Sequence, residues 1–322
     1  MAHWKLLGLA AVAVMWMGLT GARAQDAEPQ AGAAAAPASE ESAEPGKPQE
    51  VSVGVYVLSV GRLDIGTGSF SADFYLSLKS DGPVPESFEF MNGTGALDKI
   101  IDKPNEKFYR VKASLSSPID FKRFPFDTQN LQIILEDKEK TIKELVYVPE
   151  MKETGFDQSV MFPGWVITGW KPSVSRHDYP AYEETYSQYV FNVGIGRIKF
   201  NSFLKTFLPI FVLMLITVTS FILNPDQIVT RLGAVSSTLM ATVMMGISIS
   251  SQIPPVGYLT FADKVMIVTF VLLLSAFFLN VMIFVLQGKG KKEETKTLNK
   301  WAERLMFFGV PICYVLLFLF VS

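Results

Sequence analysis

The stretch SSPIDFKRFPFDTQNL, residues 116–131, decides how the rest of the chain is interpreted. It has the pattern of a strand end, a tight turn and the start of a second strand. Phe124 and Phe126 flank Pro125, and Asp127 follows, so a turn that is ordinarily polar carries two large rings. The fixed backbone angle of Pro125 is expected to hold both rings outward. An exposed turn of this kind needs an explanation from the segments around it.

Strand-like segments surround this turn from Val51 to about Ile198. β-branched and aromatic residues recur in VSVGVYVLSV (51–60), KFYRVKASL (107–115) and YSQYVFNVGI (186–195), and turn-forming residues separate such segments. The pattern predicts an all-β, immunoglobulin-like sandwich over residues 51–198. One short helix is expected near Ala96–Ile101.

Four apolar segments of helical length follow the predicted sandwich. Each is close to the roughly 20 residues that cross a bilayer, so residues 199–322 are predicted to form a transmembrane domain. The connection GKGKKEETKTLNK (288–300) holds five lysines, and NPDQIVTR (224–231) contains Arg231. The positive-inside bias places both connections in the cytoplasm, and the sandwich and carboxyl terminus outside an inner (plasma) membrane. The four predicted helices are 202–222, 228–250, 262–286 and 301–321.

The amino terminus has the features of an export signal. Lys5 precedes an apolar run from Leu6 to Leu19, and Ala22-Arg23-Ala24 fits the small-x-small cleavage pattern, so residues 1–24 are predicted to be a signal peptide. A retained membrane anchor is the alternative, although the run is short for a hydrocarbon layer of about 30 Å. Residues 25–50 are rich in Ala, Pro and Glu and are predicted to be a disordered tether.

The second apolar segment, RLGAVSSTLMATVMMGISISSQ (231–252), is too polar to face lipid all round. Steps of four and three residues define one stripe that is polar at both ends and apolar from Met240 to Ile247. In a ring of identical helices, this stripe would line a water-filled tube whose apolar constriction stops ions by dewetting. The alternative is that the small residues only allow close helix packing. The stripe consists of Gly233, Ser237, Met240, Met244, Ile247 and Ser251.

Composition argues against an enzyme and against a nucleic-acid-binding protein. The formal net charge is only −2. After the predicted signal peptide there is one histidine, His177, and the single cysteine, Cys313, lies in the last apolar segment. No phosphate-binding glycine loop and no metal-spaced His/Cys set occurs, so no cofactor and no metal site are expected. His177, beside Asp178, either contributes to proton sensitivity or is an exposed loop residue.

Together these features resemble the pentameric ligand-gated ion channels, the family that includes the Cys-loop receptors, from about Val51 to Ser322. Animal members enclose the aromatic turn between two cysteines, whereas Ser117 and Leu131 stand at those places here, as in prokaryotic members that lack the disulfide. Arg197 precedes Pro209 by twelve residues, the spacing of the pre-helix arginine and helix-one proline of the family. The segment from Pro254 through GYLTFAD resembles the family's connection between its second and third helices.

The resemblance implies a homopentamer in membrane lipid that conducts permeant ions along its second helices. Its ligand, a small molecule or ion of unknown identity, would bind between the outer domains and open the pore. Asp127 would be desolvated between the two domains and would need a charged partner, for which Arg197 is the candidate. The alternative for the turn itself is that it covers an edge of the sandwich. The residues implied in gating are Phe124, Pro125, Phe126, Asp127, Arg197, Pro254, Pro255 and Tyr258.

The resemblance also gives candidate ligand contacts. Many receptors carry a tryptophan of an aromatic, amine-binding site where Asp137-Lys138 stand here. The sequence therefore does not decide whether this chain has such an amine-binding site. Trp165 and Trp170 are interpreted as sandwich packing. The candidate rings are Tyr75 from one subunit and Phe90, Tyr179, Tyr182 and Tyr186 from its neighbour.

The inner pore mouth is assigned to Asp226 and Arg231. Cation-selective relatives usually have an acidic residue near this place, where Val229 and Thr230 stand here. Five inward Arg231 side chains would disfavour cations, but the preferred interpretation turns Arg231 sideways toward the membrane interface. Cation conduction is expected by analogy with bacterial members. A membrane-anchored periplasmic sensor or solute-binding protein without conduction is the alternative function.

Overall fold

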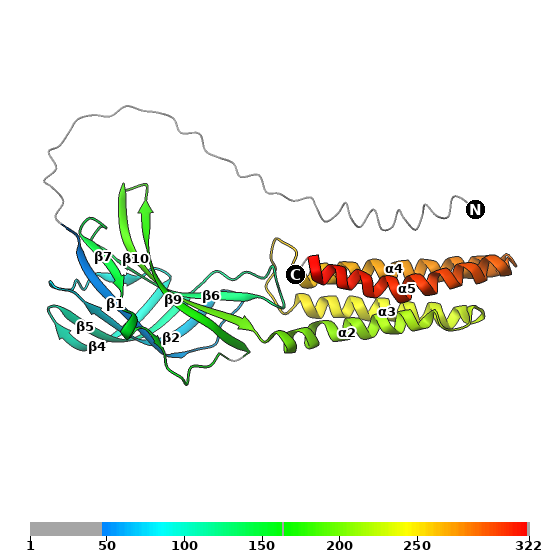
Figure 1. Ribbon diagram of the computed structural model, residues 1–322, viewed down its shortest axis with the longest axis horizontal. Helices are drawn as coiled ribbons and strands as arrows, with labels where there is room; N and C mark the ends of the chain where they lie inside the picture. Colours follow the sequence, from blue (N-terminus) through cyan, green and yellow to red (C-terminus); the bar gives the residue numbers. More distant parts are fainter. Residues whose placement is uncertain (1–46, 163, 321–322) are drawn as a thin grey trace, which may run out of the picture. The chain divides into compact units, whose positions relative to one another are not determined.

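The computed structural model describes residues 47–162 and 164–320, which form two β-sheets followed by four long helices (Figure 1). The predicted signal peptide and residues 25–46 of the predicted tether lie outside the described residues. β1 begins at Gln49, two residues before the expected start of the sandwich.

The two sheets together contain the ten strands found in the described residues. The first has the order β4-β5-β2-β1-β7, with β8 paired to β1, and the second has the order β3-β6-β10-β9. The strands of the first sheet are β1 (Gln49–Val60), β2 (Ser69–Lys79), β4 (Gly93–Lys103), β5 (Glu106–Ser116), β7 (Leu145–Pro149) and β8 (Gly155–Phe156). Those of the second sheet are β3 (Phe88–Phe90), β6 (Thr128–Asp137), β9 (Trp165–Tyr179) and β10 (Glu184–Arg197).

Alternating side chains from both sheets build one apolar core. Every second residue of β1 from Val51 to Val57 is buried, and β10 contributes Tyr189, Phe191, Val193 and Ile195. This alternation of buried and outward residues is the period of a strand with one face in the core. The fold is the predicted β-sandwich.

The expected short helix near Ala96–Ile101 is wrong, because these residues lie in β4. They pair with β5 in antiparallel register, from Ala96 opposite Lys112 to Ile101 opposite Phe108, with a bulge after Lys99. Ala and Leu favour helices, but the hydrogen-bond ladder to β5 decides the local structure here. Nearby, the Asn92 amide donates to Ser116 O (2.8 Å) and Gln132 O (2.7 Å), and so bridges the two sheets.

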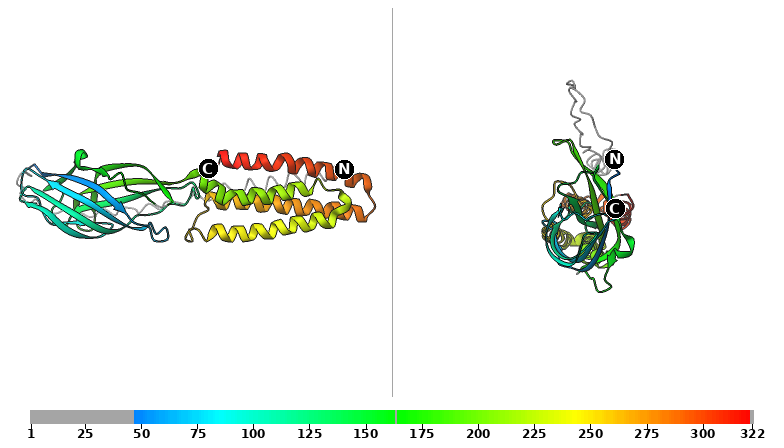
Figure 2. Two further views of the ribbon diagram at one scale, coloured as in Figure 1. Left: turned by 90° about the horizontal axis from the view of Figure 1, so that it is seen from below. Right: turned by 90° about the vertical axis from the view of Figure 1, so that its left-hand side faces the viewer.

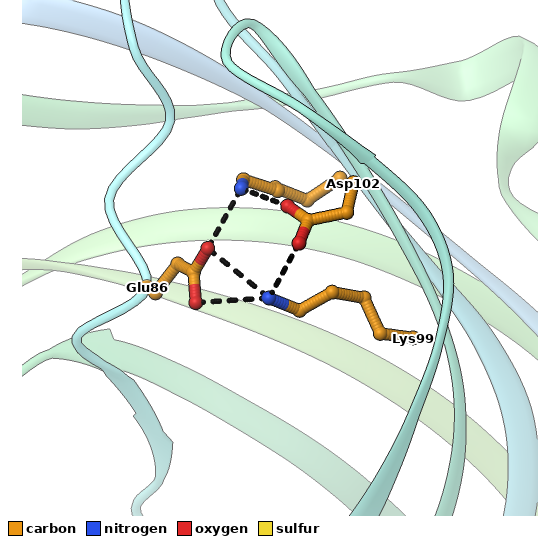
Figure 3. A network of polar contacts seen from close by, with 4 residues as sticks. Glu86, Lys99 and Asp102 are labelled. Atoms are coloured by element: carbon orange, nitrogen blue, oxygen red, sulfur yellow. Dashed lines mark hydrogen bonds and ion pairs between the residues drawn. The ribbon is translucent and has the colours of Figure 1, made fainter.

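A network of four charges joins β4, β5 and the segment before β3 (Figure 3). Lys107 Nζ lies 2.7 Å from Glu86 Oε1 and also pairs with Asp102, and Lys99 Nζ lies 3.0 Å from the other oxygen of each carboxylate. The hydrogen bonds from Lys107, followed by those from Lys99, hold the pKa of Glu86 and of Asp102 below the usual carboxyl value. The same two carboxylates raise the pKa of Lys107.

We expect Lys107→Met to lower the melting temperature of the sandwich by a few degrees at neutral pH. The carboxylate contribution is present above about pH 4 and is lost as pH falls through the lowered pKa values; the lysine contribution is lost above about pH 10. The difference from wild type should therefore be largest between these limits and shrink toward pH 3. Thermal melts followed by tryptophan fluorescence test this, with Lys112→Met, an exposed change on the same strand, as control. Equal melting temperatures of wild type and Lys107→Met would contradict it.

Four helices long and apolar enough to cross a membrane follow the sandwich. α3 contacts α2 and α4, and α5 packs on α4 and α2, so the four run side by side as a bundle (Figure 2). Polar side chains also meet inside the bundle, where the hydroxyls of Thr217 and Thr238 lie 3.0 Å apart. The helices are α2 (Lys199–Ser220), α3 (Ile228–Ser250), α4 (Phe261–Gly288) and α5 (Lys292–Phe320).

α5 begins at Lys292 rather than at 301, so most of the lysine-rich connection is helical. Two pairs at spacing three, Lys291–Glu294 and Glu293–Lys296, lie at this start, and acidic residues in a first turn suit the helix dipole. The extra turns bring Thr295 and Asn299 into the buried face of the bundle.

Candidate functional site

The aromatic turn forms part of the amino-terminal cap of α4. Phe261 N donates to Lys122 O at 2.9 Å and Ala262 N donates to Phe124 O at 3.0 Å. A capping box of Thr260 and Asp263 satisfies the next amide, so the first amides of α4 are all paired. The main chain of the turn is thereby joined to α4 independently of its side chains.

Pro125 was expected to hold both rings of the turn outward. In the structure, the two rings do not both point outward. Phe124 is buried, and only Phe126 packs on the helices, with its ring centroid 5.9 Å from those of Phe207 and Phe261. The reason is Arg197, whose guanidinium carbon lies 5.1 Å from the centroid of Phe124 and 4.6 Å from that of Trp165. Trp165 therefore combines sandwich packing with a cation–π contact.

Asp127 is 1% exposed and is fully engaged in hydrogen bonds. Its Oδ1 accepts from Arg197 Nε at 2.7 Å, and its Oδ2 accepts from Gln129 Nε2 at 2.7 Å. Gln129 also bonds the main chain of Asp120. The buried carboxylate thus fixes the end of β10 against the start of β6, at the point where β10 leads into α2.

The connection between α3 and α4 reaches the turn through Tyr258. The Tyr258 hydroxyl accepts from Phe121 N at 2.9 Å and donates to Asp120 Oδ1 at 3.3 Å. Pro254 and Pro255 precede it in the same connection, and Pro255 is exposed. The contact of this connection with the turn therefore depends on the tyrosine.

One face of α3 is free of contacts with the other helices. Met240, Met244 and Ile247 are 71, 64 and 60% exposed, and Gly233, Ser237 and Ser251 are exposed as well. At 3.6 residues per turn, the opposite face carries the residues that are buried in the bundle. These are Arg231, Val235, Thr238, Thr242 and Ile249.

Arg231 has no exposed side chain in the structure, whereas the sequence predicted a position at the inner pore mouth with the side chain turned toward the membrane interface. It is fully buried inside its own bundle, where Nη1 donates to Asn299 Oδ1 at 2.8 Å and the guanidinium carbon lies 4.9 Å from the ring centroid of Phe221. Asn299 belongs to the part of α5 that was predicted to be a loop. Asp226, in the short turn Pro225–Gln227, is exposed.

The candidate ligand rings have different surroundings. Phe90 is a core residue, packed edge-on against Phe74 at 5.8 Å, so its assignment as a ligand contact is wrong. Tyr75 stacks on Phe108 at 5.2 Å on the first sheet. Tyr179 and Tyr186 lie edge to face at 5.5 Å on β9 and β10, and Tyr182 is 73% exposed in the turn between these strands.

A buried carboxylate, Glu136, lies next to these tyrosines. It is 3% exposed and bonds three neighbours: His177 Nδ1 at 2.8 Å, the Tyr179 hydroxyl at 2.9 Å and Gln188 Nε2 at 3.0 Å. Burial and the bond to Glu136 raise the pKa of Tyr179 to about 12. His177 is a strand residue and not an exposed loop residue.

Comparison with known proteins finds ion channels among the relatives of the chain. No family model matches the chain. A proton-gated ion channel of Gloeobacter violaceus is 23% identical over 298 residues, which cover 84% of this chain and 81% of the relative. This similarity supports the pentameric ligand-gated ion channel family for the chain. With its four membrane-capable helices, the chain is a multi-pass membrane protein with an extracellular β domain, and it is not an enzyme.

A second relative matches over a shorter span of the channel. The pH-sensitive chloride channel 2 of Anopheles gambiae is 25% identical over 160 residues, which cover 47% of this chain and 26% of that protein. The match therefore spans about a quarter of that relative.

Sequence reasoning did not single out the buried carboxylate Glu136. Its signal was present in LQIILED (131–137), where a carboxylate interrupts an otherwise apolar strand. Its partners could not be read from the sequence, because they depend on the register that sets Gln188 opposite Glu136 and Tyr186 opposite His177.

We expect Asp127→Ala to destabilise the channel by about 3–5 kcal/mol, because it leaves the Arg197 guanidinium without its carboxylate at the domain junction. Thermal melts in detergent, combined with the yield of assembled protein by size exclusion, measure the loss. Arg123→Ala is the matched control, since it removes an exposed charge from the same turn. A melting temperature equal to that of the control would show that the pair does not stabilise the junction.

Proposed function

We propose that five copies of this chain form a cation-conducting channel in which α3 lines the pore. Residues 51–198 would form the ligand-binding domain and residues 199–322 the membrane domain. The observation that carries the proposal is the exposed stripe on α3, which lies opposite the face that α3 buries in its own bundle. The serines at the ends of this stripe are unfavourable against lipid, so the stripe should face protein or water. A water-filled axis shared by five subunits provides that environment.

Gating in this proposal depends on the apolar middle of the stripe. Met240, Met244 and Ile247 present large apolar side chains on successive turns. Five copies of each would surround a constriction that excludes water when narrow and conducts when slightly wider.

The ligand would act through β10. A ligand between β domains favours one arrangement of the β9–β10 hairpin, and β10 ends at Arg197. From there the Asp127 pair, the turn and Tyr258 form a chain of contacts to the α4 end of the α3–α4 connection. The ligand shifts the closed–open equilibrium only by its difference in affinity for the two states.

Cation conduction is supported by the charges at the inner end of α3. Arg231, the cation that would repel permeant cations there, is buried within the subunit. Asp226 is exposed in the turn that precedes α3. Five such carboxylates at the inner mouth would raise the local concentration of cations.

Met240→Ser should shift the closed–open equilibrium toward open by roughly tenfold, because a hydroxyl makes the constriction easier to wet. Currents of the purified channel in planar bilayers measure the open fraction at rest and under stimulus. Val243→Ser makes a similar polar change on an exposed flank of α3 and should leave gating unchanged. Indistinguishable gating of the two variants would remove Met240 from the constriction.

Asp226→Asn should reduce the preference for cations, seen as a reversal potential closer to zero under a salt gradient. Glu303→Gln removes the same charge from an exposed position on α5 and serves as control. If both variants keep the wild-type reversal potential, Asp226 does not set selectivity. If the wild-type protein conducts under none of the conditions screened, the alternative of a sensor without conduction is favoured.

A further inference from the structure

Glu136 is a buried carboxylate whose charged partner can only be a histidine. In the part of the chain that the structure describes, no lysine or arginine lies within 4.0 Å of it, and His177 is its one ion-pair candidate. The charged and titratable groups that act with Glu136 on the neighbouring tyrosines are acidic or phenolic. Glu89 on β3 and Tyr186 on β10 act on Tyr179, Glu184 and Asp137 act on Tyr186, and Asp137 acts on Tyr147 of β7.

The position of one proton of His177 follows from the hydrogen-bond geometry when Glu136 is ionised. An ionised carboxylate only accepts, so the hydrogen between Glu136 Oε2 and His177 Nδ1, 2.8 Å apart, then belongs to Nδ1. The Gln188 amide then donates to Glu136 rather than to the ring. A second proton can only enter at Nε2, and the side chain is 37% exposed, so water reaches the ring.

Adding that proton gives the ring a positive charge, so its hydrogen bond to the carboxylate becomes an ion pair between opposite charges. The imidazole is the side chain whose charge ordinarily changes between about pH 5 and 8. His177 lies on β9 and Glu136 on β6, with β10 between them. Protonation therefore strengthens the attachment of the outer strand β9 across β10 to β6.

The same two strands connect this cluster to the domain junction. Glu136 and Gln188 face each other at one end of the β6–β10 pair, and Asp127 and Arg197 close the other end. Nine residues separate Gln188 from Arg197, a span of about 30 Å along one continuous strand. A change at the hairpin thus acts on the strand that ends in the pair at the membrane domain.

We propose that Glu136 and His177 form a proton-binding site, occupied at acid pH, that fastens the β9–β10 hairpin and favours the open channel. The proposal rests on the proposed function and names its ligand as the proton. Tyr179 and Gln188 position the carboxylate through their hydrogen bonds to it.

The decisive variant is His177→Gln, whose amide can still donate to Glu136 but cannot take up a proton. Currents are recorded in bilayers while the extracellular pH is stepped from 8 to 4. Relative to wild type, the half-activating pH should fall by about one unit, a tenfold higher proton concentration. The control Asp178→Asn removes a titratable group from the neighbouring position, where it bonds Thr185, and should leave the pH response unchanged.

A second variant and a second measurement keep failure of this site separate from failure of conduction. Glu136→Gln should shift the pH response in the same direction, and the double variant should shift it no further than the larger single one, because both changes remove one ion pair. Hydrogen exchange of the β9–β10 hairpin, corrected for intrinsic rates, should slow between pH 7.5 and 5.5 in wild type but not in His177→Gln.

Each outcome decides one question. Superimposed pH–current curves for wild type and His177→Gln overturn the proton site and leave the channel intact. Hairpin protection that responds to pH through His177 in a protein without current supports the proton site and overturns the proposed conduction. Hydrogen-exchange protection of the hairpin that changes equally with pH in wild type and His177→Gln overturns the proton site.

Discussion

The buried pair of Asp127 and Arg197 is the interaction on which the arrangement of this channel depends. A carboxylate that is 1% exposed carries a large desolvation cost, which is offset here by two short hydrogen bonds and by rings on both sides of the guanidinium. Replacing both partners by apolar residues could preserve stability. Such a replacement would lose a defined geometry, because the pair fixes the end of β10 and the start of β6 relative to the turn.

Main-chain contacts make this geometry available to the membrane helices. The carbonyls of Lys122 and Phe124 accept from the first amides of α4, so a shift of the turn changes the cap of a helix as well as the packing of its side chains. Phe126 adds an apolar contact with α2 and α4. In the proposed channel, this junction of a helix cap, a ring and an ion pair would carry a small change in the sandwich to α2 and α4, the helices that it contacts.

The sequence predicts the sandwich and the four helices, because strand alternation and segment length are local constraints. The partnership of Asp127 with Arg197 came from the family resemblance, and the structure contains this pair. It fails where long-range register decides. β4 carries helix-favouring residues but is held by the ladder to β5, and Phe90 has the composition of a binding ring but the burial of a core residue. Arg231 finds Asn299 only because α5 begins nine residues earlier than hydropathy suggests.

The sequence allows two roles for Arg231, and its place in the structure distinguishes between them. A cation at the inner end of a pore helix either sets the field along the axis or fastens the helix to its neighbours. Full burial, a hydrogen bond to α5 and a ring contact with Phe221 assign the side chain to the second role. In the proposed channel, the field at the pore mouth would then be set by exposed groups such as Asp226. Selectivity and helix packing would depend on different residues, so each could change without the other.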